Sequence, residues 1–348
     1  MKLLIATDAW APQVNGVVQT LASTISELKR RGTSVQLISP ELFPSAALPG
    51  YHEIRMAWPR LSIIREVIRS FAPDHVHIAT EGPIGWAMRR ICLQQNLGFT
   101  TSYHTRFPEY LRARLPVPLT LSYKALRRFH GAGDGVMVAT SSIEQELVTR
   151  GFANLMRWSR GVDLDGFHPD AARQSHGRFL CSLPRPIFLC VGRLAVEKNL
   201  DAFLSLELPG SKVVVGDGPA ADGLKARYPN AVFLGAKDYA ELPALYADAD
   251  VFVFPSRTDT FGLVLIEAVA CGLPVAAFPA PGPLDVIGSS GAGVISEDLR
   301  TAALEALHID RTLCRQHAET FTWERATDQF IANILQARDR HGIIRKAA

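Results

Sequence analysis

The chain has 348 residues, of which 47% are hydrophobic and 20% are charged, and its formal net charge is +3. At roughly 150 residues per domain this length predicts about two globular domains, and the composition excludes a disordered, coiled-coil or collagen-like chain. No apolar run reaches the roughly 18 residues that a transmembrane helix needs, and Asp8 comes too early for a signal peptide.

Strands and helices alternate along the first half of the chain. Apolar periodicity predicts helices at 17–31 and 84–95, and strands at 2–7, 34–39, 74–79, 99–103 and 135–140. Because these strands are apolar on both faces, they indicate a parallel sheet that helices cover on both sides.

The pattern breaks between Gly161 and Pro186, where Gly, Pro and Asp residues cluster as in a linker. A last helix is expected from about Trp323 to His341, after a second run of strands at 187–192, 212–216, 231–234, 251–254 and 275–277. The α/β pattern therefore predicts two Rossmann-like parallel-sheet domains, at 1–170 and 171–322, followed by a C-terminal helical segment at 323–348. Ligands of such sheets bind beyond the carboxyl ends of the strands, so we expect the two domains to face each other across a cleft.

The segment from Pro255 to Ala268 follows the strand at 251–254 and opens a helix at about Gly262. Free N–H groups and the helix dipole suit a phosphate there, and glycine allows a close approach to the backbone. Asp259 before the helix can reach a sugar hydroxyl, and Glu267 inside it can accept hydrogen bonds from a ribose diol. The alternatives are that Asp259 caps the helix and that Glu267 is a surface acid.

Arg193 and Lys198 follow the strand at 187–192, so they should lie at the same sheet edge as Asp259. Two cations at that edge would neutralise a diphosphate. The alternative is an ordinary surface ion pair with Glu197.

Two Asp-x-Asp triplets, Asp163–Asp165 and Asp248–Asp250, could hold a divalent metal on a diphosphate, but turn chemistry explains the second triplet. No Gly-x-Gly-x-x-Gly follows the first strand, which disfavours a nicotinamide enzyme. Five scattered cysteines form no Cys-x-x-Cys pair, so we expect buried thiols in a reducing cytoplasm. We therefore expect neither a metal nor another cofactor.

Taken together, these motifs resemble a retaining glycosyltransferase of family four, which has the GT-B fold. The likeness rests on Pro255–Ala268, Gly192–Leu194 and Glu197–Asn199, and on further matches at Asn15–Val17, Ser102–Thr105, Arg128–His130, Ser159–Asp163, Val214–Pro219 and Tyr246–Val251. The most similar members glycosylate membrane lipids such as diacylglycerol or mannosylate lipid carriers. In one departure, Asp259 stands where the family usually has Glu, and its shorter arm could shift the contact with the donor sugar.

The resemblance implies a UDP- or GDP-linked hexose as the donor. Glu267 would bind its ribose, and Arg193 and Lys198 would hold the leaving diphosphate. Asp259 would contact hydroxyls of the donor sugar, and His104 would lie near the transferred sugar unless it is an ordinary histidine at a strand end. Further donor contacts would come from Gly16, Val17, Thr260, Phe261, Gly262, Leu263 and Val264.

The mechanism that the resemblance implies is a front-face transfer without a metal, in which the leaving diphosphate helps to deprotonate the acceptor hydroxyl. Charge stabilisation and orientation then carry the chemistry. The last helix would cross back onto the N-terminal domain.

The stretch from His104 to His130 carries a net charge of +5, because Glu109 is its only acid. Its six cations are Arg106, Arg112, Arg114, Lys124, Arg127 and Arg128. Basic and apolar residues interleave as in segments that lie on anionic membranes, and the alternative is a helical hairpin packed on the sheet with solvated arginines.

We therefore expect a lipid acceptor and a cytoplasmic enzyme that associates peripherally with the inner face of the cell membrane. A soluble or polysaccharide glycan acceptor stays open, and so do a sugar-nucleotide epimerase and a non-catalytic nucleotide-sugar binder. A nucleic-acid partner is disfavoured, because the chain lacks aromatic stacking platforms and a strong positive charge.

Overall fold

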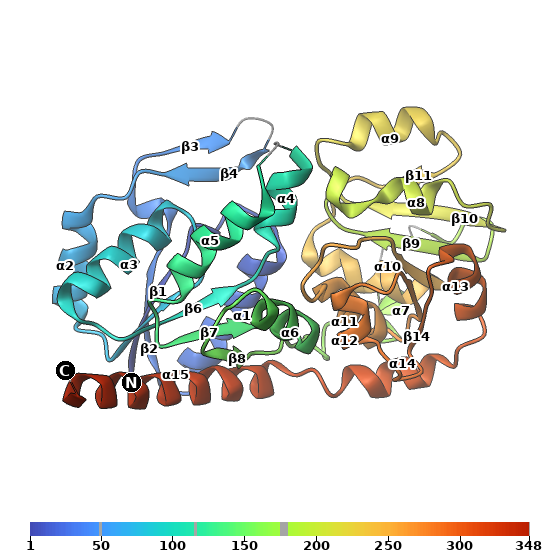
Figure 1. Cartoon of the computed structure of the whole chain (residues 1–348). Coiled ribbons are helices and arrows are strands. Elements are labelled where there is room, and N and C mark those ends of the chain that lie inside the picture. The colour runs from blue at the N-terminus through green and yellow to red at the C-terminus, as the bar shows by residue number, and fades with distance from the viewer. Residues whose placement is uncertain (49–50, 115–116, 175–179, 348) are drawn as a thin grey trace. The chain divides into compact units, whose positions relative to one another are not determined.

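The computed structural model describes residues 1–48, 51–114, 117–174 and 180–347, and the chain divides into two compact units (Figure 1). Unit 1 comprises Met1–Ser159 and Trp323–Ala348, and unit 2 comprises Arg160–Thr322. The boundary therefore precedes the expected one at 170/171. The reason lies in Phe167, which is fully buried in unit 2 with its ring 5.2 Å from that of Tyr239.

A six-stranded parallel sheet forms the centre of unit 1, with the strand order β2-β1-β5-β6-β7-β8. Its strands are β1 (Lys2–Ala6), β2 (Ser34–Ile38), β5 (His75–Ile78), β6 (Phe99–Tyr103), β7 (Gly135–Val138) and β8 (Leu155–Arg157). A separate antiparallel pair consists of β3 (Ser45–Leu48) and β4 (Tyr51–Ala57). The sequence did not predict β3, β4 or β8, because they are short or lack a continuous apolar pattern.

Helices cover both faces of this sheet. Along β1, Leu4 and Ala6 pack toward one set of helices, whereas Leu3 and Ile5 pack toward the other. The first set comprises α2 (Leu61–Phe71), α3 (Pro83–Gln95), α5 (Leu119–His130) and α6 (Ser141–Thr149). The second set comprises α1 (Gly16–Arg30) and α15 (Trp323–Ala347). The remaining elements of unit 1 are η1 (Pro40–Leu42) and α4 (Phe107–Arg114).

Unit 2 has its own six-stranded parallel sheet, with the order β11-β10-β9-β12-β13-β14. Its strands are β9 (Ile187–Val191), β10 (Ser211–Val215), β11 (Val232–Phe233), β12 (Val251–Phe254), β13 (Val275–Ala277) and β14 (Gly293–Ile295). The chain runs outward from β9 to β11 and then returns to the other side of β9. The strand order thus reverses between β9 and β12, which is where ligands of such sheets bind.

One face of the second sheet packs against a core that includes Leu200, Phe203 and Leu299. These residues come from α8 (Leu200–Leu204) and α13 (Leu299–Ala306), and α9 (Ala221–Arg227) joins them. The other helical elements of unit 2 are α7 (Ala171–Gln174), α10 (Leu242–Asp248), α11 (Leu263–Ala270), α12 (Pro281–Val286) and α14 (Arg311–Ala318), with the single turns η2 (Val196–Lys198) and η3 (Tyr239–Glu241).

Four of the five cysteines are buried and all five are free thiols. Cys181 is exposed, contrary to expectation, because it lies outside both sheets in the segment that leads to β9. Among the residues that the structure describes, no helix offers the length of apolar sequence that a bilayer crossing requires.

Helix α15 completes the core of unit 1. Phe330, Ile334 and Ala337 are fully buried on one face of this helix, and the ring of Phe330 lies 4.7 Å from that of Trp158. The C-terminal segment is therefore part of the unit that the N-terminal strands build.

Replacing Phe330 with Ala should lower the free energy of unfolding of unit 1 by about 3–5 kcal/mol, because it leaves a cavity at the sheet. All five tryptophans lie in unit 1, so urea titration followed by tryptophan fluorescence measures this unit. Leu335→Ala is the matched control, since Leu335 is 49% exposed on the same helix. Equal losses for the two variants would contradict a role for α15 in the core.

Candidate functional site

The carboxyl ends of β9 and β12 place two loops side by side in unit 2. The two strands pair in parallel, so Gly192–Asn199 and Pro255–Gly262 leave the sheet at the same edge. The Asn199 side chain donates a hydrogen bond to the Pro255 carbonyl at 3.1 Å, and the Thr258 hydroxyl donates one to the Glu197 carbonyl at 3.1 Å. The loops therefore hold each other through direct contacts.

An ion pair joins the same two loops, with Lys198 Nζ 2.5 Å from Asp259 Oδ1. Burial by itself would raise the pKa of Asp259, but the charge and hydrogen bond of Lys198, with smaller effects of Ser256 and Arg193, leave the pKa below its ordinary value. The alternative that Asp259 caps the helix is wrong. The N-cap of α11 is Gly262, at φ 83°, which has no side chain to cap the helix, and Asp259 Oδ1 contacts Lys198 instead.

Arg193 stands on the first of these loops, with its Nη2 2.9 Å from Glu197 Oε1. This is the ion pair that the sequence offered as an alternative to a diphosphate site. Glu197 is nearly buried, whereas about a third of the Arg193 side chain is exposed. A guanidinium has five N–H donors in a fixed planar arrangement, so one arginine can contact more than one acceptor at a time.

The loop after β10 completes this edge through backbone contacts. Leu194 N donates to Asp217 O at 2.8 Å, and Gly216 N donates to Gly235 O at 2.8 Å. Gly216 has a φ of 136°, and a Cβ atom there would lie 1.9 Å from the Gly192 carbonyl oxygen. Only glycine fits at this crossing, so backbone rather than side chains forms this part of the edge.

Glu267 lies on α11 with 5% of its surface exposed, so the alternative of a surface acid is wrong. The Tyr239 hydroxyl donates to Oε1 at 3.2 Å and the Tyr246 hydroxyl donates to Oε2 at 3.1 Å. Burial raises the pKa of Glu267 to about 7, although both tyrosines act in the opposite direction. The sequence assigned neither tyrosine a contact with Glu267, because contacts across more than twenty residues leave no local pattern.

The residues that lead into α11 and begin it, 260–264, precede Glu267 by a few positions in the chain. Thr260 and Phe261 are buried, and Gly262, Leu263 and Val264 are half-buried. The N–H groups of the first helical turn have no partner within the helix, so those of Leu263 and Val264 are available to an anion.

Two arginines donate hydrogen bonds to the second Asp-x-Asp triplet. Arg185 lies 2.6 Å from Asp248 Oδ1 and 2.9 Å from Asp250 Oδ1, and it also donates to the Asp248 carbonyl. Arg311 donates to the carbonyls of Ala247 and Ala249, which lie on either side of Asp248. These carboxylates therefore fasten the end of α10.

The first triplet forms a turn, in which Asp163 Oδ1 accepts hydrogen bonds from the N–H groups of Asp165 and Gly166, both at 3.1 Å. The described residues contain no group of three or more His, Cys, Asp or Glu side chains that could hold a metal ion.

Unit 1 carries the remaining predicted site residues. His104 follows β6 and is half-buried, with its ring edge-on to Trp158 at 5.7 Å. Gly16 begins α1, and the Asn15 side chain accepts the N–H groups of Val17 at 3.0 Å and Val18 at 3.1 Å. The Val17 amide is thus already used by the cap.

Two acids lie near the carboxyl edge of the first sheet. Asp8 caps α3, because its Oδ1 accepts the N–H of Ile84 at 2.8 Å. Glu81, which the sequence did not single out, lies 3.1 Å from Nε2 of the buried His130. Each of these two acids is therefore held by a partner within unit 1.

The basic stretch forms α4 and α5, and its residues divide into inward and outward groups. Arg106 turns inward, 3.0 Å from Glu146, and α5 buries Tyr123, Leu126 and Phe129. The inward Arg106 and the buried face of α5 agree with the alternative of a helical hairpin packed on the sheet. The outward cations are Arg112, Lys124, Arg127 and Arg128, and the side chain of Arg114 lies outside the described residues.

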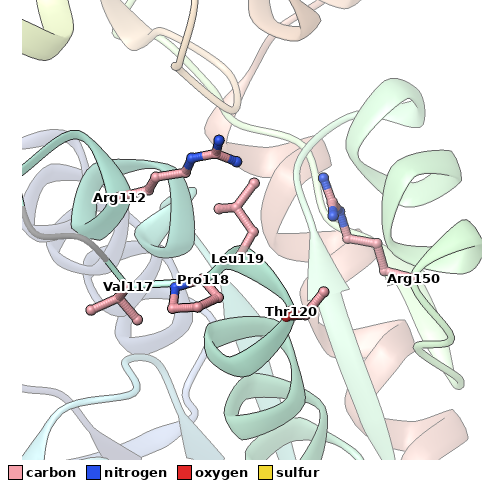
Figure 2. A pocket seen from close by; sticks show the side chains of 6 residues that line it. All are labelled: Arg112, Val117, Pro118, Leu119, Thr120 and Arg150. Carbon is pink, nitrogen blue, oxygen red and sulfur yellow. The ribbon is translucent and has the colours of Figure 1, made fainter.

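A hollow of about 700 Å³ opens beside these two helices, lined by Arg112, Val117, Pro118, Leu119, Thr120 and Arg150 (Figure 2). Figure 2 shows the Leu119 side chain between the guanidinium groups of Arg112 and Arg150. Arg150 lies 2.9 Å from Glu146 and 3.8 Å from the centre of the Tyr123 ring. Apolar side chains and two arginines therefore line the hollow together.

Comparison with known proteins assigns the chain to a family. Residues 14–165 match the model described as Glycosyltransferase Family 4, and residues 185–309 match that of glycosyl transferases group 1. The chain is 30% identical over 316 residues to a GDP-mannose-dependent alpha-mannosyltransferase of Mycolicibacterium smegmatis, a match that covers 85% of this chain and 84% of the relative. The chain belongs to the family 4 glycosyltransferases. It is a hexosyltransferase that uses nucleotide sugars.

Other proteins similar to this glycosyltransferase carry different names. It is 26% identical to the alpha-monoglucosyldiacylglycerol synthase of Streptococcus pneumoniae, over 88% of this chain and 78% of that one. Among solved structures, sucrose-phosphate synthase from Thermosynechococcus elongatus matches with a TM-score of 0.72 at 20% identity, covering 99% of this chain and 98% of that one. Anabaena HepE in complex with UDP-glucose matches with a TM-score of 0.68 at 14% identity, over the whole of both chains. The two parallel-sheet units are thus those of the GT-B fold.

Replacing Lys198 with Met should lower the free energy of unfolding of unit 2 of the glycosyltransferase by about 1–3 kcal/mol at neutral pH, because Asp259 loses its charged partner. The pKa of Asp259 is lowered in the folded state, so this stabilisation exists above the unfolded-state pKa and disappears as the pH falls through the folded-state pKa. Calorimetric unfolding should therefore show a difference from wild type that shrinks in acid.

Two controls accompany this measurement. Lys225→Met removes an exposed lysine from α9 in the same unit and should leave stability unchanged. Adding Asp259→Asn to Lys198→Met should recover part of the loss. A loss that is the same at acid and neutral pH would contradict the assigned ion pair.

Proposed function

We propose that this glycosyltransferase moves a hexose from a UDP- or GDP-linked donor, with retention of configuration, to a hydroxyl group of a membrane lipid such as diacylglycerol. The observation that carries the donor half is the ion pair of Lys198 with Asp259, which lies at the same sheet edge as Arg193. Cations and a carboxylate at the carboxyl ends of adjacent parallel strands suit a diphosphate next to a sugar.

In this proposal, Arg193 and Lys198 bind the diphosphate and stabilise its charge as it leaves. Lys198 then shares its charge between Asp259 and the phosphate oxygens. The free N–H groups at the start of α11 add hydrogen bonds to the same phosphates, and Glu267 accepts hydrogen bonds from the ribose.

Transfer then depends on charge stabilisation and orientation. Asp259 contacts hydroxyls of the donor sugar and His104 contacts the transferred sugar. The leaving diphosphate takes the proton of the acceptor hydroxyl as the new glycosidic bond forms on the same face, so no covalent enzyme intermediate is required. Arg193 and Lys198 supply the positive charge that a metal ion supplies to diphosphates elsewhere, and we propose that none is needed.

The lipid acceptor is supported by features of unit 1 and by one relative. Arg112, Lys124 and Arg128 are exposed on α4 and α5, where Leu121 is 60% exposed and Phe107 is 51% exposed. Cations beside exposed apolar side chains suit an anionic membrane surface. The pneumococcal relative is named for a glucosylated diacylglycerol.

The donor and the reaction class are tested together. GDP-mannose or UDP-glucose should raise the melting temperature, because a ligand that binds the native state stabilises it by mass action. Release of the free nucleoside diphosphate should require an acceptor and should persist in excess chelator. Release without an acceptor, or none with any acceptor, would favour an epimerase or a non-catalytic binder, and a loss with chelator that Mn²⁺ or Mg²⁺ restores would overturn the metal-independent mechanism.

Membrane binding is tested by changing Arg112, Lys124 and Arg128 to Ser. Each cation near an anionic surface contributes about 1 kcal/mol, so binding to phosphatidylglycerol vesicles at low salt should weaken by a factor of about 150. Lipid glycosylation should fall in parallel, whereas donor affinity should stay unchanged.

The matched control changes Lys225, Arg227 and Arg300 of unit 2 to Ser, which removes the same charge from exposed positions. If wild type does not bind these vesicles, or if the control weakens binding equally, the surface formed by α4 and α5 has no role in docking and a soluble glycan becomes the better acceptor.

A further inference from the structure

Two tyrosine hydroxyls hold the carboxyl group of Glu267 inside unit 2. Tyr239 belongs to η3 and donates to Oε1 at 3.2 Å, and Tyr246 belongs to α10 and donates to Oε2 at 3.1 Å. Tyr246 is fully buried, whereas Tyr239 is 39% exposed. The two hydrogen bonds come from different elements, so they fix the carboxyl plane as well as its position.

The surroundings of this carboxyl group contain neutral donors rather than cations. Besides the two tyrosines, Cys271 at the end of α11 faces the group, and Asp163 lies beyond Tyr239. Arg311 and Arg315 of α14 act on Cys271, but no described Lys, Arg or His forms an ion pair with Glu267. Without a nearby cation, burial favours the protonated acid, and it raises the pKa of this group to about 7.

The tyrosines also leave a defined number of acceptor sites. A carboxylate offers about four lone-pair sites, and one hydrogen bond to each oxygen uses two of them. Two sites remain, which is the number that the two hydroxyls of a ribose diol require. A protonated carboxyl group loses one of these sites to its own proton, so it cannot accept both hydroxyls.

We propose that Tyr239 and Tyr246 are positioning residues that direct the carboxyl group of Glu267 at the donor's ribose, and that donor binding releases one proton from this carboxyl group to the solvent. The inference rests on the proposed function, because it takes Glu267 as the ribose-binding residue. No covalent bond to the donor changes in this step. Both ribose hydroxyls keep their protons and donate hydrogen bonds, and the carboxyl proton passes to water.

Donor affinity should therefore increase with pH across neutrality. The ionised form binds and is the minor form below a pKa of about 7, so affinity falls as the pH drops through this value. Calorimetry should give a dissociation constant about tenfold lower at about pH 8 than at about pH 6. At about pH 7, titrations in two buffers of different ionisation enthalpy should show release of about half a proton for each donor bound.

The probes are intact GDP-mannose and UDP-glucose. Their phosphates are diesters and stay ionised across this pH range, whereas a terminal phosphate takes up a proton near pH ~6 and would obscure the result. Glu267→Gln should bind donor with an affinity that no longer depends on pH. Because His104 is unchanged in this variant, a pH dependence that persists would come from another group.

Tyr246→Phe and Tyr239→Phe test the positioning role. Each change removes a hydrogen bond that favours the ionised carboxylate, so the midpoint of the affinity profile should move upward by up to about one pH unit. Tyr228→Phe is the matched control, since the Tyr228 hydroxyl donates to Asp201 at 2.9 Å in the same unit. This control should leave the profile unchanged.

The results of these experiments test the inference about proton release separately from the proposed function. Donor binding that is independent of pH in wild type, or the same profile in both tyrosine variants as in wild type, overturns the inference and leaves the proposed function intact. If neither donor binds at any pH, the proposed function fails as well. Should Tyr246→Phe unfold, the partly exposed Tyr239 still carries the test.

Discussion

Parallel pairing of β9 with β12 is the constraint on which the candidate donor site depends. It brings two loops, separated by about sixty residues of sequence, to one edge of the sheet, where Lys198 meets Asp259 at 2.5 Å. The ion pair could not form if β12 followed β10 in spatial order, because the reversal of strand order is what places these two strands side by side. Gly192 after β9 and Gly216 after β10 pass each other so closely that only backbone fits there, and no side chain of the described residues fills this part of the edge.

The elements that the sequence predicted best are those whose neighbours on both faces are apolar. The predicted bounds of 99–103, 251–254 and 275–277 agree with β6, β12 and β13, because buried parallel strands carry an uninterrupted apolar signal. The fold class is confirmed for the same reason. The β3–β4 pair and the strands β8 and β14 escaped prediction, since polar residues or glycine interrupt their short apolar runs.

The candidate site was predictable as a set of residue types but not as a set of contacts. Motif spacing located Asp259 and Glu267, yet their partners lie far along the chain and depend on the folded sheet. Arg106 shows the same limit. Its charge counted toward a basic surface in the sequence, but the structure turns it toward Glu146 of α6, so it ties the residue before α4 to that helix. Charge totals along a segment therefore overstate the charge that a partner meets.

The arginines at the end of α10 have a consequence for how the Glu267 environment can move. Arg185 and Arg311 bind the last carbonyls of this helix, directly after Tyr246, so the helix end cannot fray or rotate without breaking several charged hydrogen bonds. Tyr239 stands on a single turn that is partly open to water. The Tyr246 side of the carboxyl group is therefore expected to be rigid, and the Tyr239 side to be more mobile. Any breathing that admits a ribose should begin on the Tyr239 side, and amide protons of η3 should exchange with solvent long before those of α10.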